Sequence, residues 1–157
     1  MRITKYKTVL DNERCNILVK EKATNYKGEE LSTPIAVAKM LNLVFSLNKQ
    51  TEEYAYMVAV DTKCKPIGVF EISHGTVNAS LVTPREILIK ALLVGAVSII
   101  IAHNHPSGCS EPSLLDIKMT RRIKKACDLI GINLLDHLIV GDLEYYSFKE
   151  KNKEIEL

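Results

Sequence analysis

Four residues suited to metal-assisted chemistry lie close together in this sequence, in the pattern H-x-H-x7-S-x2-D formed by His103, His105, Ser113 and Asp116. Zinc prefers neutral imidazole and carboxylate ligands, and three protein ligands leave the fourth position of a tetrahedral ion open, as in catalytic zinc sites. We therefore predict that His103, His105 and Asp116 bind one Zn²⁺ ion per chain. Because zinc lowers the pKa of a coordinated water to about 7, the pattern indicates hydrolysis near neutral pH.

Each half of this pattern also has an ordinary structural explanation. A histidine at the end of a strand is more often a hydrogen-bonded polar residue than a metal ligand, and Ser113 with Asp116 fits the N-cap and N3 positions of a capping box. The metal interpretation therefore depends on the combination of paired histidines with S-x-x-D. Two other histidine motifs do not fit, because HNH nucleases spread their residues over a longer unit and the P-C-x-x-C segment of zinc deaminases is absent.

The segments around the pattern predict how its residues come together. Residues 96–102 form an apolar, largely β-branched run that is typical of a buried strand. Residues i and i+2 of a strand point to the same side, so His103 and His105 at its end should point the same way. The Pro-Ser-Gly segment that follows favours a turn, and a helix expected over 113–130 would then bring Asp116 back towards the two histidines.

The rest of the chain predicts an α/β fold in which helices flank a mixed sheet. Further strands are expected at residues 4–10, 15–20, 54–61, 67–73, 134–140 and 145–148, with the first four forming two hairpins. Helix boundaries are expected at Ser32 or Thr33 with Pro34, at a Thr83–Glu86 capping box, at Gly95 and at Gly131.

Length and composition indicate a globular protein with a single domain. The chain has 157 residues, of which 46% are hydrophobic and 25% are charged. Its net charge of +2 is nearly balanced and gives no general signal for nucleic-acid binding. A local exception is the basic run at 121–125, for which a solvated helix face is the simpler explanation. No apolar run is long enough to span a membrane, so no membrane association is expected.

The cysteines and the first residues indicate a reducing compartment. The four cysteines, Cys15, Cys64, Cys109 and Cys127, form no C-x-x-C pair and no spacing typical of a disulfide framework. The first residues show no apolar signal region, so we expect a cytoplasmic protein. Cys109 lies inside the predicted metal loop, where a bystander role is favoured over that of an additional ligand or an oxidation-sensitive thiol.

With these residues in view, the sequence resembles the JAMM (MPN/JAB) metallopeptidases, and within them the RadC-like branch. The H-x-H-x7-S-x2-D pattern is the JAMM motif. The words that match the RadC-like branch in order and spacing are GTVNAS at 75–80, TPRE at 83–86, AHNHPSG at 102–108, PS at 112–113 and LLDHLIVG at 134–141. The resemblance covers residues 31–149 and implies an MPN/JAB, cytidine-deaminase-like architecture there. A short N-terminal extension at 1–30 and a charged, frayed tail at 150–157 are expected on either side.

The resemblance also implies a glutamate upstream of the histidines that acts as general base. Glu53 stands directly before an expected strand, where the JAMM motif places this residue, and the adjacent Glu52 is the alternative. Glu71 and Glu86 fit less well, because they belong to a hairpin strand and to a capping box. The resemblance further implies that the Ser113 hydroxyl helps to stabilise the oxyanion of the tetrahedral intermediate.

Other polar residues have simpler explanations. Asp136 and His137 are adjacent on an expected strand and should point to opposite faces, so a structural role is expected for both. His74 is expected in a loop and not at the metal. Asn78 and Ser80 belong to a RadC-like word and are expected to line the groove near the metal.

The pattern together with the resemblance implies a zinc-dependent hydrolase of the JAMM type, a metallopeptidase that cleaves a peptide or isopeptide amide in a protein or peptide substrate. Two alternatives stay open, a non-catalytic zinc-containing interaction module and a DNA-associated accessory protein. The DNA alternative is weaker, because residues 1–30 contain no counterpart of the helix-hairpin-helix region of longer RadC-like proteins. Only the basic run at 121–125 supports it. A homodimer formed through a sheet edge is a further open alternative.

Overall fold

The computed structural model describes residues 1–75, 82–151, 155 and 157. Within them, seven strands form one mixed sheet in the order β2-β1-β4-β3-β5-β6-β7. The strands are β1 (Arg2–Leu10), β2 (Asn16–Asn25), β3 (Glu53–Val60), β4 (Pro66–Gly75), β5 (Ser98–Asn104), β6 (Asn133–Val140) and β7 (Tyr145–Ser147). The helices are α1 (Pro34–Phe45), α2 (Pro84–Val94), α3 (Leu114–Ile130) and α4 (Phe148–Lys151), with a short 3-10 helix at Leu47–Lys49. The predicted α/β fold is therefore confirmed.

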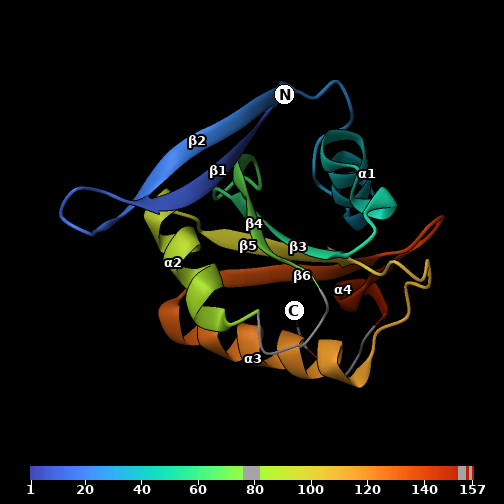
Figure 1. Ribbon diagram of the computed structural model, residues 1–157. Coiled ribbons are helices and arrows are strands. Elements are labelled where there is room, and N and C mark those ends of the chain that lie inside the picture. Colours follow the sequence, from blue (N-terminus) through green and yellow to red (C-terminus); the bar gives the residue numbers. More distant parts are fainter. Residues whose placement is uncertain (76–81, 152–154, 156) are drawn as a thin grey trace.

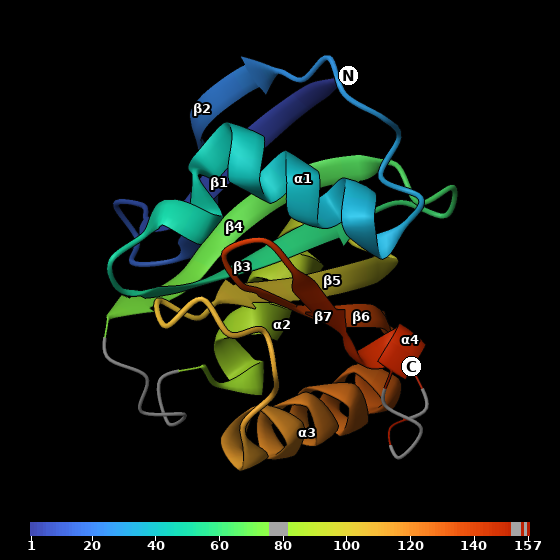
Figure 2. The ribbon, with the colours of Figure 1, turned by 90° about the vertical axis from the view of Figure 1, so that its right-hand side faces the viewer.

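Helices cover both faces of the sheet. Helix α1 lies on one face, and α2 and α3 lie on the other, as Figure 1 and Figure 2 show from two directions. Strand β3 divides its buried side chains between these faces, with Tyr56 and Val58 on the α1 side and Met57 and Ala59 on the side of α2 and α3. A strand buried on both faces reads as a continuous apolar run, which explains the absence of polar alternation in β3 and β5. Among the described residues, no helix is long and apolar enough to cross a membrane.

The connection between β5 and β6 determines where the predicted metal-binding segment, residues 103–113, lies in the fold. These two strands are parallel neighbours, so the chain has to cross over between them, and α3 makes the crossover. The segment from His103 to Ser113 therefore joins the carboxyl end of a central strand to the N-terminus of a long helix. On its other side β5 pairs antiparallel with β3, and Ala55 lies opposite His103. The start of β3 and the end of β5 are thus brought together.

Local signals determine the helix boundaries as predicted. Thr33, Thr83 and Ser113 are N-caps, and each side chain accepts a hydrogen bond from the backbone N–H three residues on. Gly95 and Gly131 end α2 and α3 with φ angles of 70° and 81°, a left-handed conformation that glycine adopts without strain.

The capping box expected at α2 is wrong in one half. The Thr83 side chain accepts from the Glu86 N–H, but the Glu86 carboxylate bonds Arg85 Nη1 at 2.8 Å. The Glu86 carboxylate is directed to this neighbouring cation and not back to the N-cap, so only the Thr83 half of the box forms.

Both ends of the chain are more structured than expected. The β1–β2 hairpin is longer than predicted and joins the main sheet, because β1 also pairs in parallel with β4 at Lys5–Val69 and Tyr6–Phe70. At the other end the expected frayed tail at 150–157 is wrong where the structure describes it, since Phe148–Lys151 form α4 and Ile155 is buried. Residues 152–154 and 156 lie outside the described residues. Ile155 packs in an apolar cluster with Phe148, which ties the end of the chain to the sheet.

Candidate metal centre

The structure brings the three predicted metal ligands together on the face of the sheet that carries α2 and α3. His103 is the penultimate residue of β5, His105 follows the strand, and Asp116 lies in the first turn of α3. His103 Nε2 lies 3.1 Å from His105 Nε2 and 3.2 Å from Asp116 Oδ1, and His105 Nε2 lies 3.6 Å from Asp116 Oδ2. One ligand atom from each residue lies within 4.8 Å of the others, so the cluster could hold a metal ion.

The chemistry of the donor set fits a cation. His105 Nδ1 lies 2.8 Å from the carbonyl oxygen of Cys109, which only accepts, so Nδ1 carries the proton and Nε2 of the neutral ring has a lone pair. Two ring nitrogens and a carboxylate oxygen converge, and such an arrangement is stable only when a metal ion or a proton shares it. Two imidazoles and one carboxylate are a set that zinc accepts with its fourth position open.

The pKa values in the cluster show the same electrostatic complementarity. Burial opposes the ionisation of Asp116, but the hydrogen bonds that His103 and His105 donate when their rings are protonated outweigh it and hold the pKa of this carboxyl well below its usual range. The hydrogen bond to Asp116 in turn raises the pKa of His105 against the effect of burial. Asp116 is therefore an anion over the whole physiological range, as a metal ligand has to be.

Asp116 is both a helix cap and a member of the metal cluster. Its Oδ2 accepts hydrogen bonds from the backbone N–H of Ser113 at 2.8 Å and from Ser113 Oγ at 2.6 Å. The predicted capping box of α3 is thus confirmed. The box orients the carboxylate so that Oδ1 faces His103, so the cap interpretation of S-x-x-D is compatible with the metal interpretation. The Ser113 hydroxyl proton is engaged with Asp116 in this arrangement.

Glu53 is the first residue of β3, and its carboxylate lies beside the cluster. Residues i and i+2 of a strand share a face, so Glu53 lies on the side of Ala55, which pairs with His103. Its Oε2 is buried and has no hydrogen-bond partner among the described residues. Burial raises the pKa of Glu53, as does Asp116, whereas His103 and His105 lower it. The adjacent Glu52 is exposed.

Asn104 holds the backbone on both sides of Glu53. Its Oδ1 accepts from the Tyr54 N–H at 2.7 Å, and its Nδ2 donates to the Glu52 carbonyl at 3.0 Å. The backbone pairing of β3 with β5 ends at Ala55, and beyond it the Asn104 side chain supplies the hydrogen bonds between the two strands. Sequence reasoning missed this residue, although a buried amide at the end of an apolar strand signals that it needs partners.

His137 is a second residue whose position the sequence did not reveal. It lies on β6, is fully buried, and its Nε2 is 2.9 Å from His103 Nδ1. Burial lowers the pKa of His137 well below its usual value, so the ring is neutral.

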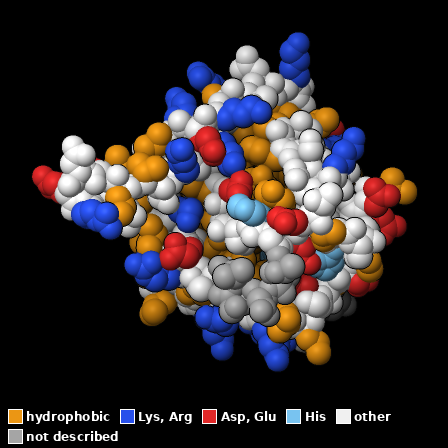
Figure 3. All heavy atoms as spheres, in the orientation of Figure 1, with side chains coloured by type: hydrophobic (Ala, Val, Ile, Leu, Met, Phe, Trp, Pro, Cys, Tyr) orange, Lys and Arg blue, Asp and Glu red, His pale blue; other side chains and the backbone are white. Residues whose placement is uncertain are grey.

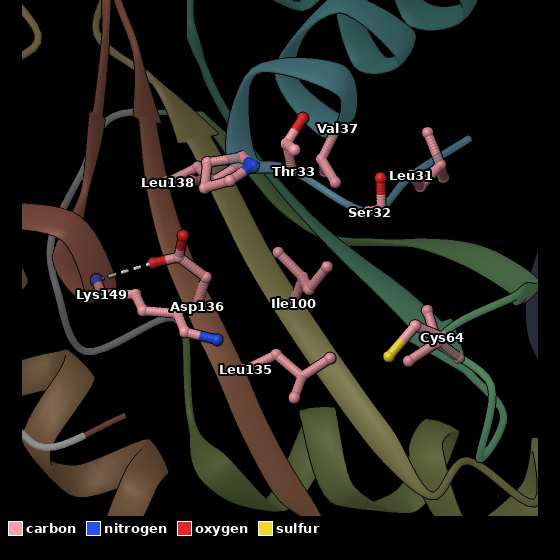
Figure 4. A pocket seen from close by; sticks show the side chains of 12 residues that line it. Leu31, Ser32, Thr33, Val37, Cys64, Ile100, Leu135, Asp136, Leu138 and Lys149 are labelled. Carbon is pink, nitrogen blue, oxygen red and sulfur yellow. Dashed lines mark hydrogen bonds between the residues drawn. The ribbon is translucent and has the colours of Figure 1, made fainter. Parts of the chain in front are cut away.

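Asp136 points to the opposite face from His137, as predicted from strand geometry. Its carboxylate accepts from Ser147 Oγ at 2.6 Å and from the Lys149 N–H at 3.0 Å, and Figure 4 shows the second of these bonds. The pocket in that view lies between β6, β5 and the start of α1 and contains none of the three cluster residues. This pocket is separate from the three-residue cluster. Asp136 stabilises the start of α4 through its bond to the Lys149 N–H.

The remaining candidates lie apart from the cluster or outside the described residues. Among the described residues the metal cluster does not include Cys109, which contributes only its backbone carbonyl to His105. The loop expectation for His74 is wrong, because it lies on β4 and bonds Glu71 at 2.9 Å. Asn78 and Ser80 lie outside the described residues.

The fold and the cluster together define the class of protein. A mixed sheet flanked by helices, with two histidines and an aspartate at the end of a central strand, is consistent with a JAB/MPN domain. Residues 31–153 match the RadC-like JAB domain family, and the chain belongs to that family. The resemblance stated from the sequence is thereby confirmed.

Curated relatives agree with this assignment. The chain is 42% identical over 138 residues to a UPF0758 protein of Clostridium perfringens, which covers 88% of this chain and 60% of that protein. It is 40% identical over 137 residues to a UPF0758 protein of Streptococcus thermophilus, which covers 87% of this chain and 59% of that protein. The chain thus spans about 60% of the length of these curated relatives.

Proposed function

We propose that this domain is a zinc-dependent hydrolase of the JAMM type, a metallopeptidase that cleaves a peptide or isopeptide amide. The observation that carries the proposal is the buried Glu53 Oε2, which has no hydrogen-bond partner among the described residues and interacts electrostatically with all three residues of the cluster. A buried carboxylate without a partner is costly, and such groups concentrate at functional sites. A structural metal site needs no base beside it.

His103, His105 and Asp116 would hold one Zn²⁺ ion. When bound, zinc supplies Lewis acidity and lowers the pKa of a coordinated water to about 7. Glu53 accepts a proton as the water oxygen adds to the amide carbon, and returns it to the amide nitrogen as the C–N bond breaks. The raised pKa of Glu53 suits this exchange, because a proton carrier works best near the pH of the reaction.

Ser113 has two roles in this proposal. Its hydroxyl bonds Asp116 in the structure, which orients a ligand. Rotation of the hydroxyl away from Asp116 would let the same proton meet the oxyanion that forms on the substrate carbonyl. The backbone N–H of Ser113 keeps its own bond to Asp116 during that rotation, so the cap is not lost.

We place the domain in the cytoplasm and expect a protein or peptide as its substrate. All four cysteines are free, which supports a reducing compartment. On the face shown in Figure 3, Lys and Arg side chains are spread among acidic and apolar ones and form no single stripe. Nucleic-acid-binding proteins typically carry Lys and Arg clustered on one face, so this face gives the DNA alternative no support.

A peptide-library digestion tests the proposed function. Zinc-loaded protein is incubated with a library of proteome-derived peptides and with ε-lysyl isopeptides, and new termini are identified by mass spectrometry. We expect cleavage by the wild type and none by Asp116→Asn, which keeps the size of the side chain but loses the ligand charge. Zinc-loaded wild type that cleaves nothing would contradict the proposal and favour a non-catalytic interaction module. Equal cleavage by wild type and Asp116→Asn would show that the cluster is not the catalytic site.

Asn104→Ala should lower the hydrolysis rate and leave zinc binding intact. Loss of the two bonds that flank Glu53 lets the start of β3 shift, and a displacement of about 1 Å from a productive geometry costs up to roughly 100-fold in rate. Zinc content should not change, because Asn104 is not among the ligating atoms. Asn133→Ala, which removes a 3.4 Å contact with Ser98 at the other end of β5, is the matched control. Loss of zinc together with rate would refute the positioning role.

A further inference from the structure

A buried chain of hydrogen bonds runs from one candidate metal ligand to the backbone of another. His103 Nδ1 lies 2.9 Å from His137 Nε2, and His137 Nδ1 lies 2.6 Å from Thr120 Oγ1. The Thr120 hydroxyl then donates to the carbonyl oxygen of Asp116 at 2.7 Å. All four residues are buried, so each polar group depends on its neighbour in the chain.

The direction of every proton in this chain follows from its last member. A carbonyl oxygen only accepts, so the single hydroxyl proton of Thr120 points to Asp116. The hydroxyl oxygen must therefore accept from His137 Nδ1–H. The neutral His137 ring then has a lone pair on Nε2, which accepts from His103 Nδ1–H.

This chain of hydrogen bonds ends at His103, whose Nε2 is oriented to bind a metal ion. When the His103 ring is neutral, with its proton on Nδ1, its Nε2 lone pair faces Asp116 Oδ1 and His105 Nε2. The carbonyl of Cys109 leaves His105 in the same tautomer. In their neutral forms, both rings therefore direct lone pairs into the cluster.

We propose that His137 and Thr120 are positioning residues of the metal centre, which fix the tautomer and orientation of His103 and thereby raise its affinity for zinc. This inference rests on the zinc site of the proposed function but not on hydrolysis. Partners of this kind hold the ring of a metal-binding histidine and increase its basicity, and their loss typically costs 10–100-fold in metal affinity.

Packing holds the residues of this hydrogen-bond chain in position. The His137 ring stacks on Phe148 of α4, with centroids 5.0 Å apart and planes inclined by 5°. Thr120 lies one helical turn after Asp116 on α3, so the chain connects β5, β6 and α3. The stacked ring and the Thr120 hydroxyl together favour the orientation in which His137 offers His103 an acceptor.

The decisive experiment measures zinc affinity by competition with a chromophoric chelator. Thr120→Val has nearly the same shape but leaves His137 Nδ1–H without an acceptor, and Thr120→Ser is the matched control that keeps the hydroxyl. We expect Thr120→Val to weaken zinc binding about 10-fold and His137→Leu up to about 100-fold, with Thr120→Ser close to wild type. A purely structural role would lower the stability of Thr120→Val without changing its zinc affinity.

A second measurement does not depend on the folding of any variant. Nitrogen-15 NMR of the imidazoles in wild-type protein reports which ring nitrogen carries the proton, and we expect protonated Nδ1 in both His103 and His137. A proton on His103 Nε2 in the zinc-free protein at high pH, or unchanged zinc affinity in Thr120→Val, would overturn this inference alone. Wild type that binds no zinc would overturn both this inference and the proposed function.

Discussion

Replacing His103 and His105 together with alanine should remove zinc from the protein. The two Nε2 atoms and Asp116 form the cluster, and a single carboxylate remains in the double variant. Four-ligand structural zinc sites bind with roughly 10–16 kcal/mol, or about 3 kcal/mol per ligand, so loss of two ligands should weaken binding by roughly 10⁴-fold. We expect about one zinc per chain in the wild type and none in the variant after dialysis, measured by inductively coupled plasma mass spectrometry.

His74→Ala is the matched control for the double variant. His74 is an exposed histidine on β4 that bonds Glu71, so its loss removes an imidazole without touching the cluster. Its zinc content should equal that of the wild type. If the double variant keeps its zinc, the metal lies elsewhere. If the wild type stays empty after zinc has been offered, the pattern is not a metal site in this chain.

The metal cluster could be predicted from the sequence because its parts are local. His103, His105 and Asp116 lie within fourteen residues, and strong strand, turn and cap signals connect them. Each of these signals acts within a few residues of chain, so their combination determines where the side chains meet. The capping box illustrates this, since the bond that starts α3 also orients Asp116.

The residues that support the cluster could not be predicted, because their partners are distant in sequence. His137 meets His103 across 34 residues, and Asn104 meets Tyr54 across 50. A polar residue in a buried segment indicates that a hydrogen-bond partner is needed, but the identity of that partner depends on strand order and register. The parallel pairing of β5 with β6 and the antiparallel pairing of β5 with β3 decide both contacts.

The same reasoning explains the errors at the two ends of the chain. The pairing of β1 with β4 is parallel and short, and no local pattern signals it. The charged composition of the last residues predicted a frayed tail, whereas two apolar residues, Ile155 and Leu157, pack in the cluster that contains Phe148. Phe148 also stacks on the His137 ring, so the C-terminal cluster contacts a residue that supports the candidate metal centre.

Glu53→Gln should abolish most of the hydrolysis while zinc remains bound. The amide keeps the shape of the side chain but cannot take a proton from water, and general acid–base catalysis contributes roughly 10²–10⁴-fold to such reactions. We expect a rate loss of about that size in a peptide-cleavage assay. Zinc content should stay at the wild-type level, because Glu53 is not among the three clustered residues.

Stability should change in the opposite direction to activity. Glu53 Oε2 is buried with no hydrogen-bond partner among the described residues, and the nearby Asp116 anion makes its charge more costly. Replacing it with a neutral amide removes that cost, so the melting temperature of zinc-free Glu53→Gln should equal or exceed that of the wild type. A merely structural glutamate would give a lower melting temperature and an unchanged rate.

Glu52→Gln distinguishes between the two adjacent glutamates. Glu52 is exposed and takes part in the site through its carbonyl, which the substitution leaves in place. Its rate should stay within a few-fold of wild type. If Glu52→Gln loses the activity and Glu53→Gln keeps it, the start of β3 must shift its register in solution, and the assignment of the base would move to Glu52. If both variants stay active, the proton passes through neither carboxylate, and the base must be sought among residues on the same face as His103.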